Sequence, residues 1–226
     1  MNSTEKNHVL DQYNTSNNRT IQRLSRARWR DVIDFIQNTQ NSEQKIFLDV
    51  GCGTGRYCFE AHTHGFGKII GLDNSEKMLE AFADKITNTD GINDTVINRI
   101  CTDIRNIKNM FDPESIDVII SVAVIPHLFD AESRKQVLVD MINISREKVL
   151  ISGWSTTYLE RKRNDGVKVN SGDYMITFED KEWYYYLQTE TDFIEYIEDV
   201  VSSINYNLSV QIFMDRENHY AIINKK

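Results

Sequence analysis

The sequence predicts an α/β fold in which a mostly parallel sheet carries helices on both faces. Short apolar runs alternate with segments of helical periodicity, and a glycine-rich turn follows the first apolar run. Residues 208–225, two apolar runs around the turn "DREN", predict an antiparallel C-terminal hairpin. We therefore expect a seven-stranded sheet whose ligand site lies beyond the carboxyl ends of the parallel strands.

The individual elements follow from the spacing of the apolar residues. Parallel strands are expected where apolar runs are short and bounded by polar residues, at 45–50, 68–73, 95–101, 116–125 and 147–154. Helices are expected where apolar residues recur every three or four positions, at 19–38, 56–64, 75–86, 131–145 and 190–204. Ser75 is the expected N-cap of the third of these helices.

The chain is expected to form one domain preceded by a short arm. Residues 1–18 are polar and rich in asparagine, which predicts a mobile arm, and residues 19–226 show no domain-breaking linker. Residues 155–172 are charged and contain two glycines, so a long loop is expected there. Short aromatic runs follow it, at 173–178 and 183–187.

Composition limits the classes of function. The 226 residues carry a net charge of −8, which argues against a surface that is basic throughout and made for nucleic acid. The three cysteines lack the spacing of metal ligands, so no metal is expected. The first residues resemble no signal peptide and no apolar run approaches the ~20 residues of a membrane span. A location in the cytoplasm, with or without a nuclear pool, and no membrane partner are therefore expected.

The glycine-rich turn "LDVGCGTGRY", residues 48–57, is the first functional motif. Gly51, Gly53 and Gly55 allow a tight turn and close approach of a ligand to the backbone. Their spacing differs from the GxGxxG of dinucleotide-binding proteins, and no P-loop lysine follows. Because Asp49 precedes the turn, a cationic ligand is favoured over a pyrophosphate. This predicts S-adenosylmethionine rather than NAD.

Acids at the ends of the next two strands extend this prediction. Asp73 is placed to accept both ribose hydroxyls of an adenosine, and Asp103 to accept from the adenine amino group with Ile104 against the ring. Three further residues complete the expected cofactor-binding set: Cys52, Tyr57 and Ser121.

Several stretches resemble one enzyme family. They are "WRDVIDFI" (29–36), "GCGTGRY" (51–57), "SVAVIPHL" (121–128), "ISGWS" (151–155), "WYYYLQTETDF" (183–193) and "NHYAIINKK" (218–226). Together they resemble the eukaryotic-type tRNA wobble-uridine (carboxymethyluridine) methyltransferases, which are class I S-adenosylmethionine-dependent methyltransferases with a Rossmann-like fold. Ser25, Pro126 and Trp183 depart from the family pattern. The resemblance implies esterification of 5-carboxymethyluridine to its methoxycarbonylmethyl form.

The resemblance and the charge pattern also suggest residues for the acceptor side, which segment 155–188 is expected to cover. An ionised carboxylate needs no general base, but it needs alignment and one cationic contact. His127 and Arg26 are the candidates for that contact, and Trp154 is the candidate for stacking on the base. Phosphate contacts are expected from two basic segments, through Arg23, Arg28, Arg161 and Arg163.

The third strand is expected to form an exposed edge of the sheet. In the family that this chain resembles, a small zinc-binding activator protein adds a strand there and forms a heterodimer with the enzyme. Val96, Ile97 and Ile100 would lie at or near that edge, and Asn98 and Arg99 offer the alternative of an edge that simply repels pairing.

Other functions remain open at this stage. A methyltransferase for a small carboxylic acid or another metabolite has the same glycine turn and acids. A binding module could keep the fold without catalysis, although Asp49, Asp73 and Asp103 are all present. A NAD-dependent oxidoreductase is disfavoured by the glycine spacing.

Overall fold

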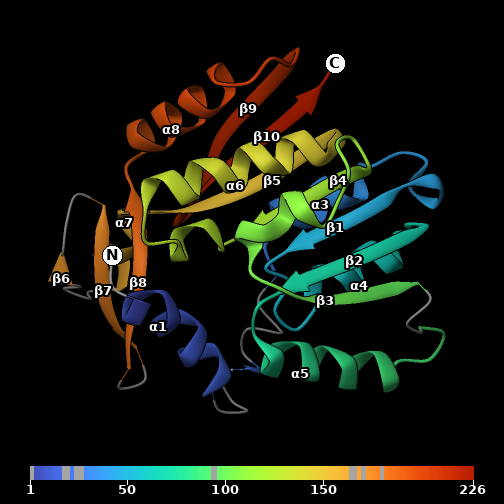
Figure 1. Ribbon diagram of the computed structural model, residues 1–226, viewed down its shortest axis with the longest axis horizontal. Helices are drawn as coiled ribbons and strands as arrows, with labels where there is room; N and C mark the ends of the chain where they lie inside the picture. Colours follow the sequence, from blue (N-terminus) through green and yellow to red (C-terminus); the bar gives the residue numbers. More distant parts are fainter. Residues whose placement is uncertain are drawn as a thin grey trace.

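The computed structural model describes residues 3–16, 21–22, 28–92, 96–162, 167–168, 172–178 and 181–226. Its main strands are β1 (Ile46–Val50), β2 (Lys68–Asp73), β3 (Ile97–Cys101), β4 (Ile116–Val122), β5 (Ser145–Ser155), β9 (Leu208–Asp215) and β10 (Asn218–Lys225). The first five pair in parallel in the order β3-β2-β1-β4-β5, and β10 and β9 continue the sheet antiparallel. The predicted α/β class and C-terminal hairpin are confirmed (Figure 1).

Helices cover both faces of this sheet. One face packs against α3 (Arg30–Gln37), α4 (Arg56–Thr63) and α5 (Glu76–Thr87), and the other against α6 (Ala131–Ile144), α8 (Glu190–Ser202) and the 3₁₀ segment η2 (Ile104–Asn109). Alternation along β1 produces the two cores, because Phe47 belongs to the first cluster and Leu48 to the second. Two further short 3₁₀ segments are η1 (Ser42–Gln44) and η3 (Ile125–His127).

The strand order reverses at β1, which lies between β2 and β4. Leu48 pairs with Ile70 on one side and with Ile119 on the other. A crevice opens at the carboxyl ends of strands where the order reverses, and ligands of such sheets bind there. The glycine turn follows β1 directly, so the fold places it at this point.

The N-terminal region differs from the prediction. The expected arm contains helix α1 (Ser3–Asn14), which contacts α5 and β8. Val9 and Gln12 of this helix are buried, and so is Ser16 just beyond its end. The expected helix over 19–38 is interrupted, because Trp29 has an extended backbone and α3 begins after it.

Segment 155–188 adds three strands to the seven expected. It holds α7 (Thr157–Lys162), β6 (Val167–Lys168), β7 (Asp173–Phe178) and β8 (Lys181–Gln188). The loop prediction for 155–172 is therefore wrong for α7 and β6, while the aromatic runs form the hairpin β7–β8. β8 joins the end of β5 in parallel, through Trp154–Leu187 and Ser155–Gln188. The hairpin stands beside α1 in Figure 1, as the contact of α1 with β8 requires.

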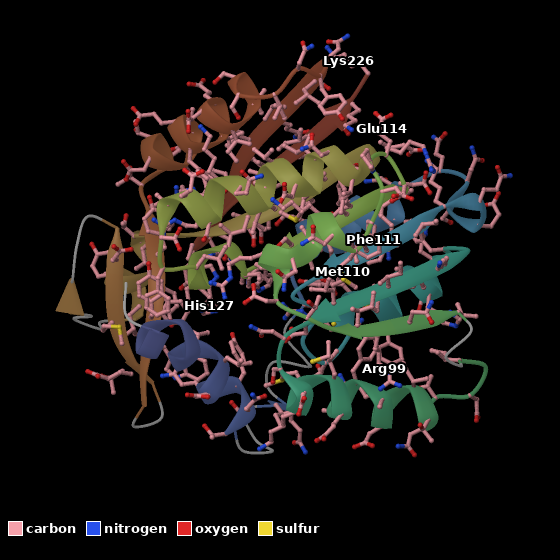
Figure 2. The ribbon with its side chains drawn as sticks, in the orientation of Figure 1. Arg99, Met110, Phe111, Glu114, His127 and Lys226 are labelled. Carbon is pink, nitrogen blue, oxygen red and sulfur yellow. The ribbon has the colours of Figure 1, made fainter. Side chains whose placement is uncertain are left out.

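β3 is an edge strand, as predicted. Ile97 is fully buried, and Val96 and Ile100 pack on the cores of the two sheet faces, so these side chains do not form the outer surface of the edge. Arg99 turns back to α5 and donates to the carbonyl of Leu79 at 3.3 Å (Figure 2). A partner strand would thus meet backbone groups here. Among the described residues, no helix has the length and apolar character to cross a membrane.

Candidate functional site

The three glycines of the turn have different roles. All have positive φ, at +77° for Gly51, +53° for Gly53 and +75° for Gly55. A Cβ on Gly51 would lie 2.2 Å from Cγ2 of Val124, and one on Gly55 would lie 2.1 Å from Cε2 of Phe82. A Cβ on Gly53 would meet no atom within 4 Å. Gly51 and Gly55 therefore serve packing, whereas Gly53 keeps open the space that a ligand needs.

Asp73 closes this turn from the end of β2. One carboxylate oxygen accepts the N–H of Gly53 and the other the N–H of Ser75, both at 2.8 Å. Burial raises the pKa of Asp73, and these backbone N–H groups partly oppose the rise. A carboxylate has about four lone-pair sites, so each oxygen retains the capacity to accept one more hydrogen bond. Two ribose hydroxyls match that capacity.

Asp49 lies beneath the turn rather than on the pocket wall. Its side chain is buried in β1, and the Cys58 thiol lies 3.8 Å from one carboxylate oxygen. Burial is the main cause that raises the pKa of Asp49 to about 7; Arg56 opposes this rise, and the charge of Asp73 adds to it. Asp49 can therefore act on a ligand only through its electric field. Gly55, Tyr57 and Ser121 are also buried behind the wall.

Asp103 and Ile104 lie where the sequence predicted, after β3 and on the pocket wall. Asp103 caps η2 by accepting the N–H of Arg105 at 2.9 Å, and its carboxylate forms a two-point ion pair with the guanidinium of the same residue. Arg105 also lines the pocket. This ion pair fixes the carboxylate at the pocket rim and takes up part of its hydrogen-bonding capacity, which the sequence did not indicate.

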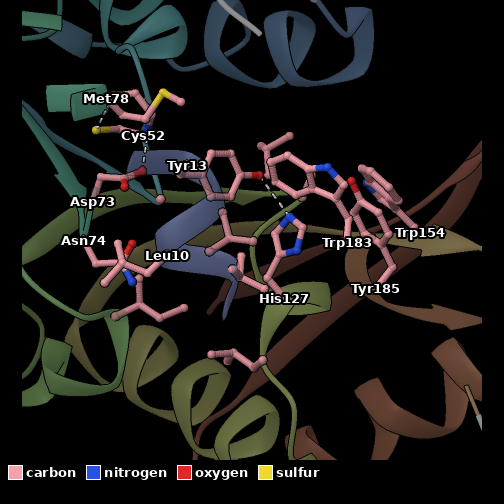
Figure 3. Close-up of a pocket in the computed structure, with 18 of the residues that line it drawn as sticks. Leu10, Tyr13, Cys52, Asp73, Asn74, Met78, His127, Trp154, Trp183 and Tyr185 are labelled. Carbon is pink, nitrogen blue, oxygen red and sulfur yellow. Dashed lines mark hydrogen bonds between the residues drawn. The ribbon is translucent and has the colours of Figure 1, made fainter. Parts of the chain in front are cut away.

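A cavity of about 660 Å³ extends from the glycine turn to a group of aromatic side chains (Figure 3). Of the predicted residues, Gly51, Cys52, Gly53, Asp73, Asp103, Ile104, His127 and Trp154 line it. Lining residues that the sequence analysis did not assign include Tyr13, Arg56, Met78, Val124, Trp183 and Tyr185. No local sequence pattern marks Tyr13 of α1 as a site residue, because only the tertiary fold brings residues 3–14 across the carboxyl ends of the strands.

His127 reaches the cavity from η3. Ala123, with φ +59°, ends the strand three residues earlier than predicted, and Pro126 lies in the first turn of η3. Nδ1 of His127 lies 3.1 Å from the carbonyl oxygen of Tyr184, and Nε2 lies 3.1 Å from the hydroxyl of Tyr13. Burial lowers the pKa of His127 to about 4, so the ring is neutral at pH 7. His127 therefore does not supply the cationic contact that the sequence analysis expected of it.

Aromatic rings form the wall beside His127. The rings of Trp154 and Tyr185 stack with centroids 4.2 Å apart, and Trp183 meets Tyr13 edge-on at 5.2 Å. The indole nitrogens of Trp154 and Trp183 are buried and have no hydrogen-bond partner. A planar ligand can stack on this wall and supply acceptors for the two indole N–H groups.

Of the predicted basic residues, the structure describes the side chain of Arg28, and that residue does not line the cavity. Arg23, Arg26 and Arg163 lie outside the described residues, and Arg161 belongs to α7. Arg28 is largely exposed and forms an ion pair with Glu60 at 2.9 Å. Within the described part of the chain, no group of three or more His, Cys, Asp or Glu residues could hold a metal ion.

Comparison with known proteins identifies the fold. Residues 47–148 match the family model described as a methyltransferase domain. A magnesium protoporphyrin IX methyltransferase from Synechocystis, crystallised with bound S-adenosylmethionine, superposes over all of both chains with a TM-score of 0.68 at 14% identity. The PH0226 protein of Pyrococcus horikoshii gives 0.69 at 17% identity over 98% of this chain and 99% of that one. This is the class I methyltransferase fold.

Curated relatives match shorter parts of this chain. The "Probable S-adenosylmethionine-dependent methyltransferase CRG1" of Saccharomyces cerevisiae is 32% identical over 96 residues, 42% of this chain and 31% of that protein. "Protein arginine N-methyltransferase 1" of Dictyostelium discoideum is 40% identical over 62 residues, 27% of this chain and 18% of that protein. The chain thus spans less than a third of the length of these relatives. The match concerns the shared domain and leaves the acceptor to be inferred from the site.

Proposed function

We propose that this protein is an S-adenosylmethionine-dependent methyltransferase whose acceptor binds against the aromatic wall. The observation that carries the proposal is the Asp73–Gly53 bond at the edge of a turn left open by Gly53. Asp73 would hold the ribose hydroxyls, Asp103 and Ile104 would bind the adenine, and the open turn would admit the methionine end. When bound, the cofactor supplies an electrophilic methyl group, and the chain's own residues align the acceptor and exclude water.

Calorimetric titration tests the cofactor. S-Adenosylmethionine and S-adenosylhomocysteine should each bind with one-to-one stoichiometry, whereas NAD should not bind, because the field of Asp49 behind the turn would repel a pyrophosphate. Binding of NAD with no binding of S-adenosylmethionine would refute the proposal. Absence of all binding would favour a module that keeps the fold without catalysis.

A small planar molecule is the acceptor that the cavity supports best. The stacked pair Trp154–Tyr185 offers an aromatic face, and Tyr13 narrows the cavity from α1. Of the cations on the described wall, Arg56 lies over the rings of Trp29 and Tyr57, at 5.4 and 4.5 Å from their centroids. Arg105 is the other, and it pairs with Asp103. Both guanidinium groups are thus engaged by other side chains, and neither is a lone charge that points to the aromatic end of the cavity.

Carboxymethyluridine in tRNA is the second candidate. The stretches that resemble the wobble-uridine enzymes meet at this cavity, since 121–128 contributes His127 and 183–193 contributes Trp183 and Tyr185. A flipped uracil could stack on the same wall. Its carboxylate would need a cation, for which Arg26 remains the predicted source.

One assay separates the two candidates. The protein is incubated with labelled S-adenosylmethionine and tRNA carrying carboxymethyluridine, with and without a small zinc-binding activator, and the nucleosides are then analysed. A methyl ester whose formation falls steeply with added salt would establish the tRNA reaction, because phosphate contacts release counterions. Absence of the ester in both mixtures would leave the small-molecule acceptor.

We also propose the activator contact at the free edge of β3. The support is that β3 pairs only with β2 among the described strands, while Val96, Ile97 and Ile100 are turned into the two cores. Backbone pairing of an added strand would therefore be the main contact. Cys101→Pro should weaken complex formation in a pull-down, because Cys101 is exposed in β3 and its N–H faces away from β2, so proline removes a group that an added strand would bond. The protein's place in the cytoplasm or nucleus also remains a proposal.

A further inference from the structure

The hydroxyl of Tyr13 occupies the aromatic end of the cavity and bonds to His127. The O–Nε2 distance is 3.1 Å, and the dashed line in Figure 3 marks this bond. Tyr13 comes from α1, while His127 comes from η3, more than a hundred residues later in the chain. A phenol from the protein itself therefore lies where an acceptor would be expected to bind.

The direction of this hydrogen bond follows from the other nitrogen. Nδ1 of His127 faces the carbonyl oxygen of Tyr184, which can only accept, so Nδ1 carries the proton. The neutral ring then presents Nε2 as an acceptor, and Tyr13 donates. A ligand that replaces Tyr13 must also donate a hydrogen bond. A hydroxyl meets this requirement, and an ionised carboxylate does not.

The surroundings of the Tyr13 ring suit an aromatic guest. Trp183 meets the ring edge-on at 5.2 Å and His127 at 5.8 Å, while Trp154 and Tyr185 form the wall beyond His127. Edge-to-face contacts of this kind favour a flat ring over an aliphatic chain. The side chain of Tyr13 thus has the two features expected of the ligand of this subsite, a flat ring and a hydroxyl.

Polar contacts join α1 to both of its neighbours. Oγ of Ser75 donates to Oδ1 of Asn14 at 2.8 Å, and the amide of Gln12 donates to the carbonyl of Glu182 in β8. The helix lies between α5 and β8 (Figure 1), and its Tyr13 lines the cavity. Such a helix can open as a unit, which would withdraw Tyr13 and expose Nε2 of His127.

We propose that the acceptor of this methyltransferase is a phenol whose hydroxyl replaces that of Tyr13 on Nε2 of His127 when α1 opens. The inference rests on the proposed cofactor. In the transfer, the phenol oxygen bonds to the methyl carbon, the carbon–sulfur bond of the sulfonium breaks with its electron pair going to sulfur, and the phenol proton passes to Nε2. The products are an aryl methyl ether, S-adenosylhomocysteine and a protonated His127 that returns its proton to water.

The test uses p-cresol, which is the side chain of tyrosine. Tyr13→Ala should leave a slot of that shape, and calorimetry in the presence of S-adenosylhomocysteine should show p-cresol binding about tenfold or more tightly than to the unmodified protein. p-Xylene, which lacks the hydroxyl, and 4-methylbenzoate, which carries a carboxylate, should each bind about tenfold more weakly than p-cresol. Leu10→Ala is the matched control, because it shortens another cavity-lining residue of α1 and leaves the Tyr13 phenol in place.

Each part of the proposal has a result that would overturn it. Equal binding of p-cresol and p-xylene overturns recognition of the hydroxyl, and tightest binding of 4-methylbenzoate assigns the site to a carboxylate instead. With S-adenosylmethionine and p-cresol, the Tyr13→Ala variant should form 4-methoxytoluene. If both ligands bind and no 4-methoxytoluene forms, the assignment of the phenol oxygen as the methyl acceptor is overturned. Circular dichroism checks that the variant is folded, and Tyr13→Phe, which removes only the hydroxyl, should gain no p-cresol binding. If S-adenosylmethionine fails to bind while p-cresol still binds to the Tyr13→Ala variant, the proposed function is refuted and the phenol subsite stands.

Discussion

Oγ of Ser75 donates a hydrogen bond to Oδ1 of Asn14 at 2.8 Å and, at the same time, accepts the N–H of Met78 at 3.3 Å as the N-cap of α5. One serine therefore caps the helix beside the cofactor site and holds the helix that covers the cavity. The first prediction follows from this link.

Asn14→Ala should loosen α1 without unfolding the domain. Loss of one neutral hydrogen bond costs about 1 kcal/mol, which makes local opening of α1 about five times more frequent. Hydrogen exchange of residues 3–16 should accelerate accordingly, while exchange in β1 and β4 stays unchanged. Asp11→Ala, at an exposed position of the same helix, is the control and should change exchange much less.

Asp73→Asn should weaken cofactor binding by about tenfold or more. The amide offers one acceptor where the carboxylate offers two, and its NH₂ would face the N–H of Gly53 or that of Ser75. Calorimetry with S-adenosylhomocysteine measures the loss. Asp84→Asn makes the same chemical change at an exposed position of α5 and should bind normally. Equal affinities of the two variants would contradict the assignment of Asp73.

Asp49→Asn should raise stability near neutral pH. Burial raises the folded pKa of Asp49 to about 7, above the ordinary value of 3.8, so the folded state holds the proton more tightly than the unfolded state. The destabilisation from ionising Asp49 is absent below pH 3.8, grows as pH rises, and is complete above about 7. The melting temperature of the variant should exceed that of the unmodified protein at pH 8 and match it near pH 4. A constant difference at all pH values would contradict this origin.

Asp49→Asn should also weaken binding of the cationic cofactor, because it removes a negative charge behind the glycine turn. S-Adenosylhomocysteine lacks the sulfonium charge, so its affinity should fall less than that of S-adenosylmethionine. Calorimetric titration of both ligands measures the difference. An equal loss for the two would show that Asp49 does not act on the sulfonium through its field.

Gly51→Ala should mainly lower stability, whereas Gly53→Ala should mainly lower cofactor affinity. The alanine methyl at 51 would overlap Val124, so we expect a stability loss of roughly 2–4 kcal/mol from the clash and the positive φ together. At 53 the methyl enters open space, so the stability loss should be about 1 kcal/mol while cofactor affinity falls at least about tenfold. Gly91→Ala is the matched control, because Gly91 also has positive φ and open surroundings but lies outside the cavity wall.

Tyr184→Phe should destabilise the β7–β8 hairpin. The hydroxyl of Tyr184 donates to the Asp173 carboxylate at 2.6 Å, and the ring stacks on Phe129 with centroids 4.0 Å apart. Phenylalanine retains the stacking and loses the charged hydrogen bond, for a cost of roughly 1–3 kcal/mol. Denaturant unfolding measures it, and Tyr206→Phe, at an exposed tyrosine, should be neutral.

Much of the cofactor half of the site could be predicted from the sequence. The turn with Gly51 and Gly53 and the strand-end acid Asp73 are local features, and parallel strands bring their carboxyl ends to one edge in any sheet of this class. Asp49 shows the limit of such reasoning, because its position in the sequence could not reveal that its carboxyl group lies behind the wall. The sequence likewise could not show whether the Asp103 carboxylate would bind a ligand or a neighbouring side chain. In the structure it pairs with Arg105.

The sequence by itself determined the seven main strands, the helices that cover them and the place of the glycine turn, because hydrophobic periodicity and turn chemistry act within a few residues. Only the tertiary structure decided the acceptor side. There Tyr13, His127 and Trp183 come from three distant segments. The neutral state of His127 depends on burial by its neighbours, and its tautomer depends on a carbonyl 57 residues away in the chain. Contacts and desolvation of this kind arise from packing between segments, so no local pattern encodes them.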